Sequence, residues 1–277
     1  MNKAAMTKCP TIALLGQPNS GKSTLFNGLT GARQRVGNWP GKTVEKKEGY
    51  YDRDGVRYRV TDLPGTYSLS ANSEEEIITR DYIASGQADV VCILADSSQL
   101  SRSLFMLADY AGIECPAVLL LNLMDVAEAQ GKKVDANKLE EKLGIPVIPF
   151  VAADRKQYGS FYEAIDQALK EKKQISIDSL IERYRTIEKG VYEELFALMP
   201  PEGIDNYSSH WLAIKLIEGD TAILEKVKGA LEPEAFQKVQ KILSSIRNGP
   251  LHTGGCKFRW IDELLSDTLV QKQEKPL

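Results

Sequence analysis

The sequence predicts an α/β fold with a mostly parallel sheet and helices on both faces, followed by a small all-α helical bundle. Up to about residue 170, short apolar runs alternate with helical patterns, as expected for parallel strands joined by helical crossovers. Beyond about residue 175, apolar residues recur only at helical spacing. We therefore expect two domains, at residues 1–170 and 171–277.

Apolar runs in the first domain predict buried strands. These runs lie at residues 11–15, 56–61, 89–95, 117–121 and 147–151. Alternating residues at 42–51 predict an edge strand antiparallel to the rest, joined to the strand at 56–61 through the turn Asp54-Gly55. Helices are predicted between the strands at residues 22–29, 73–85, 99–111, 135–143 and 159–170.

In the second domain, apolar spacing between residues 180 and 198 predicts one helix, which a Pro-Pro pair at 200 and 201 ends. Further helices are predicted at 209–217, 221–230, 233–246 and 257–270. Asp220, Pro233 and Gly249 stand where a cap, a first helical residue and a terminator belong. Side chains on apolar faces that we expect in the core are Phe196, Trp211, Phe258 and Trp260.

The composition is that of a globular protein. The 277 residues are 43% hydrophobic and 26% charged, and the net charge of -3 gives no electrostatic reason to expect nucleic acid as a partner. No apolar stretch approaches the ~20 residues of a membrane helix, so we expect a soluble chain of the cytoplasm. The four cysteines form no CxxC pair, which favours buried or idle thiols over disulfides or metal ligation.

A phosphate-binding loop is the most specific motif. Residues 16–23, GQPNSGKS, match the Walker A pattern between a predicted strand and a predicted helix. Backbone N–H groups and the helix N-terminus favour phosphate oxygens, Lys22 neutralises the β and γ phosphates, and the Ser23 hydroxyl is a ligand for Mg²⁺. The alternative is a chance glycine turn. The residues expected to contact the phosphates are Gly16, Gln17, Pro18, Asn19, Ser20, Gly21, Lys22, Ser23 and Thr24.

Two further motifs complete the expected phosphate site. Asp62 and Gly65 of DLPG end a strand, where the carboxylate holds a Mg²⁺-bound water and the Gly65 N–H reaches a γ phosphate. Residues 35–45, RVGNWPGKTVE, have the position of an effector loop, with Gly41 near the phosphates and Thr43 as a second Mg²⁺ ligand. Alone, DLPG is also an ordinary strand-end turn, and the effector loop equally a packed turn.

The base is predicted to be guanine. Asn122, Leu123 and Asp125 form an NxxD motif after a strand, and a carboxylate accepts the N1–H and N2–H of guanine but repels N1 of adenine. Leu123 stands where a lysine usually covers the base. The alternative is an Asx-type turn.

The next strand leads into Val151, Ala152 and Ala153, where related loops touch the guanine O6. Ala152 lacks the usual serine hydroxyl, so we expect loose base binding and quick GDP release.

Together the motifs predict a Ras-like P-loop GTPase with GTP and GDP as substrate and product. Thr66 raises a question, because many GTPases keep a glutamine there that orients water. Other polar residues receive ordinary interpretations. Glu74, Glu75 and Glu76 are expected to form a solvated acidic helix start rather than a metal site, and His210 and His252 are not expected to be ligands.

The combination of GQPNSGKSTLFN, RVGNWPGKTVEKKEG, DLPGTYSL and NLMD resembles the cytosolic G domain of the FeoB family of prokaryotic ferrous iron transporters. WLAIKLIEGD and CKFRWIDELL resemble that family's helical domain, a built-in guanine-nucleotide dissociation inhibitor. The resemblance implies a membrane domain in the full-length protein, a place on the cytoplasmic face of the inner membrane, and small Feo accessory proteins or a homo-oligomer as partners.

The resemblance also implies an answer for Thr66. Related GTPases use K⁺ held by a P-loop asparagine and effector-loop carbonyls, which here are Asn19, Gly37 and Trp39. Lys22, Thr43 and Gly65 would complete the catalytic set, with Thr66 at most in a supporting role. Alternatives are a nucleotide switch with negligible hydrolysis and a ribosome-assembly GTPase like Era. The latter is disfavoured because no KH-type GXXG context and no basic C-terminal domain is found.

Overall fold

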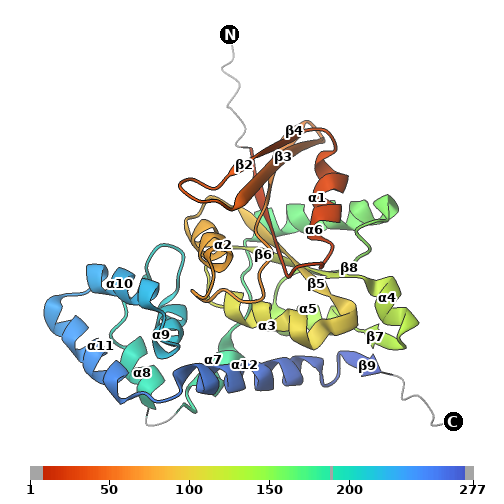
Figure 1. Ribbon diagram of the computed structural model, residues 1–277. Helices are drawn as coiled ribbons and strands as arrows, with labels where there is room; N and C mark the ends of the chain where they lie inside the picture. The colour runs from red at the N-terminus through yellow and green to blue at the C-terminus, as the bar shows by residue number, and fades with distance from the viewer. Residues whose placement is uncertain (1–8, 188–189, 272–277) are drawn as a thin grey trace.

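A seven-stranded sheet organises the first part of the chain, with the strand order β2-β3-β4-β1-β5-β6-β8 (Figure 1). The computed structural model describes residues 9–187 and 190–271. The strands of the sheet are β1 (Thr11–Gly16), β2 (Gln34–Asn38), β3 (Glu45–Arg53), β4 (Val56–Asp62), β5 (Val90–Asp96), β6 (Ala117–Asn122) and β8 (Val147–Pro149). Within it, β1 pairs in parallel with β4 and β5, and β6 pairs in parallel with β5 and β8.

The antiparallel hairpin predicted through Asp54-Gly55 is confirmed, because β3 pairs antiparallel with β4. The edge assignment was wrong, since β2 pairs with the other side of β3 and forms the edge itself. All residues of β2 are exposed, and its sequence, QRVGN, lacks the alternation of apolar and polar residues that would predict a strand. The strand predicted to reach residue 151 ends at Pro149.

Two apolar layers cover the sheet. On one face, α1 (Lys22–Thr30) and α6 (Tyr158–Glu171) share a buried cluster with Ile12 and Leu14 of β1. On the other face, α2 (Glu74–Ala84), α3 (Leu100–Tyr110) and α5 (Ala136–Leu143) share a buried cluster with Ala13 and Leu15. The predicted α/β architecture is therefore confirmed. Short elements complete this part of the chain: η1 (Ser97–Gln99), α4 (Met124–Ala129), β7 (Lys132–Val134) and η2 (Arg155–Gln157).

The remainder is helical, apart from a short strand near the end. Its helices are α7 (Asp178–Tyr184), α8 (Val191–Phe196), α9 (Ser209–Ile217), α10 (Thr221–Ala230), α11 (Pro233–Ser245) and α12 (Gly249–Leu265). The single helix expected between residues 180 and 198 was wrong, because α7 and α8 are separate and Gly190 adopts a left-handed φ of 72° before α8. The prediction of a cap at Asp220 is confirmed, since its side chain accepts from the Ile223 N–H.

Gly249 begins a helix instead of terminating one. Asn248 takes the left-handed conformation, with φ 57°, and Pro250 suits the first turn of α12. The helix predicted to run to residue 270 ends at Leu265. After it, β9 (Leu269–Gln271) pairs with β7, a strand that the sequence did not predict.

The two parts of the chain share one apolar core. In Figure 1, α12 runs from the helical bundle beneath α3 and α5 to β9, and it packs against α3, α5, α7 and α9. Trp211 and Trp260 of the helical part belong to the same buried cluster as Tyr110 of α3. Phe258 is an exception to the predicted core, because it is 57% exposed.

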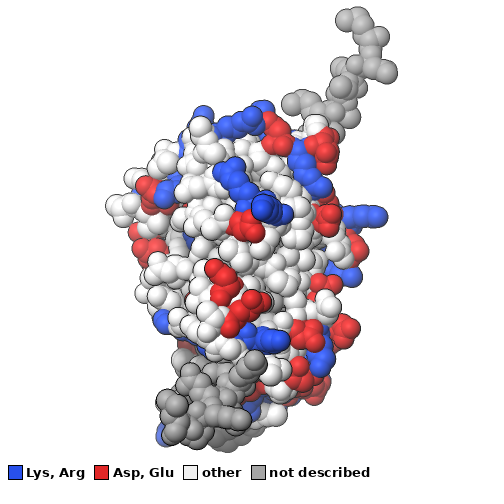
Figure 2. All heavy atoms as spheres, turned by 90° about the vertical axis from the view of Figure 1, so that its right-hand side faces the viewer, with Lys and Arg blue, Asp and Glu red and all other residues white. Residues whose placement is uncertain are grey.

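The surface of the described residues is mixed in charge where Figure 2 shows it, with Lys and Arg interspersed among Asp and Glu. Cys92, Cys115 and Cys256 are buried and Cys9 is partly exposed, and all are free thiols. Among the described helices, none has the length and apolar character needed to cross a bilayer.

Candidate functional site

A cavity of about 570 Å³ lies where β1 turns into α1. Its lining residues are Gln17, Pro18, Asn19, Gly21, Lys22, Ser23, Thr24 and Gly65. The turn is built from left-handed residues, Asn19 with φ 66° and Gly21 with φ 90°. Gly21 is required there, because an added Cβ would stand 2.0 Å from Asn122 Nδ2. The structure thus brings the predicted phosphate loop and the predicted sensor glycine into one cavity.

Lys22 and Asp62 form a buried ion pair at the floor of this site. Asp62 ends β4, which lies beside β1 in parallel, so both strands deliver their carboxyl ends to the same edge of the sheet. The hydroxyl of Ser23 and the carboxylate of Asp62 are oxygen donors of the kind that Mg²⁺ prefers. The residues present therefore fit Mg²⁺, although Lys22 and Asp62 engage each other in this conformation.

The segment after β4 lies against the phosphate loop. A Cβ added at Gly65 would meet Pro18 at 3.4 Å, and the Thr66 N–H lies 3.4 Å from the Gly16 carbonyl. The Thr66 side chain is buried, and its hydroxyl lies 3.9 Å from the sulfur of Met106 in α3. The hydroxyl is thus directed toward the core.

The effector loop is held away from the cavity. Gly37 pairs with Lys46 in the β2-β3 ladder, and the Trp39 carbonyl accepts from the Lys42 N–H at 2.9 Å. The Trp39 ring is buried against Tyr82 of α2 at 5.2 Å between centroids. The effector-loop residues that do not line the cavity in this structure are Gly37, Trp39, Gly41 and Thr43.

Asn122 connects the base motif to the phosphate loop. Its buried amide donates to the Ser20 carbonyl at 2.7 Å and accepts from the Ala152 N–H at 2.9 Å. Leu123 takes a left-handed φ of 59°, an unusual conformation for an aliphatic residue, and Asp125 is exposed in the first turn of α4. Asn122 therefore ties the phosphate loop to the loop after β8.

Sequence reasoning missed two residues that brace the loop after β8. The Gln157 side chain accepts from the Val151 N–H, and the Tyr158 hydroxyl donates to the Ala152 carbonyl, both at 2.9 Å. Neither has a motif spacing that could reveal it.

A third omission is Glu76, which was expected to be solvated. It is buried, and its carboxylate accepts from the Ser68 hydroxyl at 2.7 Å and the Asn72 N–H at 3.1 Å. Its position on the inward face of α2 explains the burial.

His210 packs against Phe196 with 4.2 Å between ring centroids, and burial lowers its pKa.

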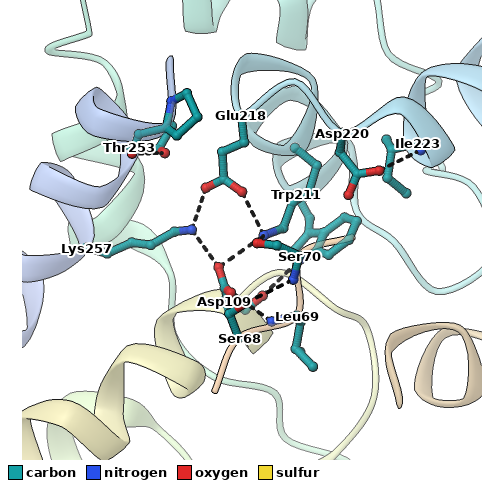
Figure 3. Close-up of polar contacts among 12 residues, drawn as sticks. Ser68, Leu69, Ser70, Asp109, Trp211, Glu218, Asp220, Ile223, Thr253 and Lys257 are labelled. Atoms are coloured by element: carbon teal, nitrogen blue, oxygen red, sulfur yellow. Dashed lines mark hydrogen bonds and ion pairs between the residues drawn. The ribbon is translucent and has the colours of Figure 1, made fainter. Parts of the chain in front are cut away.

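A buried ionic cluster joins the segment after β4 to the helical part (Figure 3). Asp109 of α3 accepts from the Leu69 N–H at 2.9 Å, from Lys215 at 3.0 Å and from Lys257 at 2.5 Å. Glu218 accepts from the same two ammonium groups at 2.8 and 2.5 Å. Burial alone would raise the pKa of Asp109, but the two lysines hold it well below its usual value. We call these four side chains the junction cluster.

Comparisons with known proteins agree with this geometry. The family model described as ferrous iron transport protein B matches residues 10–165, and the model of the FeoB cytosolic helical domain matches residues 184–250. The Fe(2+) transporter FeoB of Shigella flexneri is 36% identical over 276 residues, which cover 96% of this chain and 34% of the relative. The corresponding protein of Salmonella typhi is 34% identical, with the same coverage. The chain thus spans about a third of the length of these relatives.

Solved structures show the same arrangement. The cytosolic domain of L. pneumophila FeoB has a TM-score of 0.78 at 30% identity, covering 94% of this chain and 100% of that one. The T. maritima FeoB cytosolic domain in GDP form II has a TM-score of 0.76 at 31% identity, covering 95% and 100%. From the family models, the identity to relatives along nearly its whole length, and these folds, the chain belongs to the FeoB family.

Proposed function

We propose that this chain binds GTP and GDP, hydrolyses GTP, and serves as the cytosolic part of a FeoB-type Fe²⁺ transporter at the cytoplasmic face of the cell membrane. The observation that carries the proposal is one network around one cavity. Lys22 and Gly65 line the cavity, and Asn122 bonds both to its phosphate loop and to Ala152 beside the expected base site. Relatives named Fe(2+) transporter supply the argument for iron.

Hydrolysis requires the Lys22–Asp62 pair to open. The Lys22 ammonium then turns toward the β and γ phosphates, and the Asp62 carboxylate becomes free to hold a metal-bound water. Ser23 and Thr43 would hold Mg²⁺ directly and Asp62 would hold it through a water, and the ion would neutralise charge on the phosphate oxygens. Gly65 would direct its N–H at the γ phosphate, since no Cβ stands in the way.

K⁺ is the proposed replacement for a catalytic arginine. Asn19 lines the cavity, and carbonyl and amide oxygens are suitable donors for K⁺. Gly37 would contribute its carbonyl only after β2 separates from β3, because its backbone lies in the ladder. Trp39 lies in the loop between the two strands, and its carbonyl would turn to K⁺ once its bond with the Lys42 N–H is released. K⁺ would compensate the negative charge that develops in the transition state.

Single-turnover GTP hydrolysis in KCl and in NaCl tests this proposal. In the wild-type chain we expect faster cleavage in KCl. Asn19→Ala should lower the rate in KCl by at least about tenfold and remove the salt preference, with little change in nucleotide affinity. Asn27→Ala is the matched control, because Asn27 is an exposed asparagine of α1 outside the cavity. Unchanged K⁺ stimulation in Asn19→Ala would remove Asn19 from the mechanism.

A nucleotide switch with negligible hydrolysis is the second candidate. The observation that favours it is the direction of the Thr66 hydroxyl. It is directed at Met106, so in this conformation it is not available to orient water. Absence of cleavage in both salts, with GDP binding retained, would establish the switch. Membership of the FeoB family sets the Era-like alternative aside. Slowing of GDP release by the helical part, accessory Feo proteins and a homo-oligomer remain predictions.

A further inference from the structure

The loop after β8 leaves one backbone donor unused by the protein. The N–H groups of Val151, Ala152 and Asp154 donate to protein oxygens at 2.9, 2.9 and 2.8 Å. Ala153 is exposed, and its N–H has no acceptor among the described residues. An exposed N–H in an otherwise fixed loop is able to bond a ligand without first breaking a bond within the protein.

The direction of that N–H is set by the preceding carbonyl. The Ala152 C=O and the Ala153 N–H belong to one planar trans peptide unit, so they point in opposite directions. The Ala152 carbonyl accepts from the Tyr158 hydroxyl at 2.9 Å. By holding the carbonyl on one side, Tyr158 fixes the N–H on the other.

Tyr158 is itself rigidly placed. Its side chain is buried, and its ring lies 5.6 Å from that of Phe150. An added Cβ at Gly28 of α1 would come within 2.0 Å of the Tyr158 hydroxyl, so the glycine provides the room that the ring occupies. Burial raises the pKa of Tyr158 further above its ordinary value of 10, so the hydroxyl is protonated and able to donate at neutral pH. The contact therefore connects the phosphate-loop helix with the loop after β8.

We propose that Tyr158 is a positioning residue that aims the Ala153 N–H at the 6-oxo group of guanine. The Tyr158 hydroxyl supplies, from the start of α6, the support that a serine at position 152 gives in related loops. The inference rests on the proposed guanine-nucleotide binding. It also works against the quick GDP release that Ala152 alone would predict.

The test compares Tyr158→Phe with wild type in equilibrium binding and release of three diphosphates. GDP and IDP both carry O6, whereas 6-thio-GDP keeps N1–H and the 2-amino group but presents sulfur, a weaker acceptor. Tyr158→Phe should lower the affinities for GDP and IDP by the same factor, roughly three- to tenfold, and should speed GDP release by a similar factor. Binding of 6-thio-GDP should change less, because it depends less on the Ala153 N–H.

Tyr162→Phe is the matched control. Tyr162 belongs to the same helix and aromatic cluster, and its hydroxyl makes no hydrogen bond among the described residues. It should leave all three affinities near wild type. Unchanged GDP binding in Tyr158→Phe, or equal losses for all three diphosphates, would overturn the positioning role. A wild-type chain that does not prefer GDP to ADP would refute the proposed function itself, which is a separate result.

Discussion

Asp125 is the residue on which the predicted choice of guanine depends. It is exposed in the first turn of α4, after Leu123, which has a left-handed backbone conformation. The side-chain amide of Asn122 is hydrogen-bonded to Ser20 and Ala152. The motif spacing predicted where Asn122, Leu123 and Asp125 lie, at the end of a strand and in the turn after it, and their contact with a base stays a prediction. It could not predict that Asn122 holds two loops together, since that depends on contacts far apart in the sequence.

Replacing Asp125 tests the predicted guanine contact. In Asp125→Asn, the amide presents an NH₂ group to a base edge that offers two donors, so one donor is left unpaired. We expect GDP affinity to fall by at least about a hundredfold, while XDP, whose 2-oxo group accepts a hydrogen bond, gains affinity. Equilibrium binding of both nucleotides measures the change. Glu128→Gln, at an exposed acid of the same helix, should change neither affinity. Equal losses of affinity for GDP and XDP in Asp125→Asn would contradict the assignment.

Other residues could not be placed from sequence. Phe258 has helical spacing like that of Trp260, yet its ring is exposed and lies 5.0 Å from Phe105 across the junction of the two parts. Glu76 reads as one of three acids at a helix start, but only it faces inward. In both cases the spacing of apolar residues predicts a helix. Which side of that helix becomes buried depends on the elements that pack against it, and the spacing does not identify them.

Among the elements, β2 is the one that the proposed closure of the effector loop would have to move. It holds Gly37 in a ladder with β3, and the loop that follows packs Trp39 on Tyr82 of α2. In this arrangement Thr43 lies outside the cavity. Binding of the γ phosphate must therefore compete with the β2-β3 pairing if the effector loop is to close.

Hydrogen exchange tests that competition. With GDP bound, the amides in the β2-β3 ladder should exchange slowly. A non-hydrolysable GTP analogue with Mg²⁺ should raise their exchange rates, because pairing and closure exclude each other. Amides in the ladder between β1 and β5, which is fully buried, should not change and serve as the internal control. Equal protection of β2 in both nucleotide states would show that Gly37, Trp39 and Thr43 act without leaving β3.

Element prediction succeeded where the signal was long and failed where it was short. The buried strands and the helices α1, α2, α3, α5 and α6 were predicted from their apolar patterns. The helix α4, with six residues, was not predicted. The strands β7 and β9 have three residues each, too few for any period. Between α7 and α8 the apolar spacing continues while the backbone does not, because Gly190 turns left-handed.

At the scale of the whole molecule, the helical part is connected to the nucleotide site through the junction cluster. Asp109 bonds the Leu69 N–H, and Leu69 belongs to the segment that begins at Asp62 and Gly65. Lys215 reaches the same carboxylate from α9. Lys257 reaches it from α12 (Figure 3). A second contact joins Arg80 of α2 to Asp220, the N-cap residue of α10, and both side chains are buried. The segment after β4 is therefore bonded to the helical part through buried charged groups.

Removing one ammonium group from the junction cluster tests this connection. In Lys257→Met, Asp109 and Glu218 share the single ammonium of Lys215, so a buried negative charge is left without compensation. We expect the free energy of unfolding to fall by about 3–5 kcal/mol. GDP release should accelerate, because Asp109 no longer holds Leu69 and the segment that reaches Gly65 in one position. Chemical denaturation and the release rate of a fluorescent GDP measure the two effects.

The pH dependence of the same variant separates the charge from the packing. The folded-state pKa of Asp109 is depressed, so its stabilisation is fully present above the usual carboxyl pKa of 3.8 and is lost as the pH falls below that value. Lys257→Met removes one of the two ammonium groups that lower the pKa of Asp109. The difference in stability between the variant and wild type should therefore shrink as the pH falls below 3.8. Lys241→Met, at an exposed lysine of α11, should show neither effect. A Lys257→Met chain that is destabilised but releases GDP at the wild-type rate would mean that the helical part stabilises the fold without controlling the nucleotide.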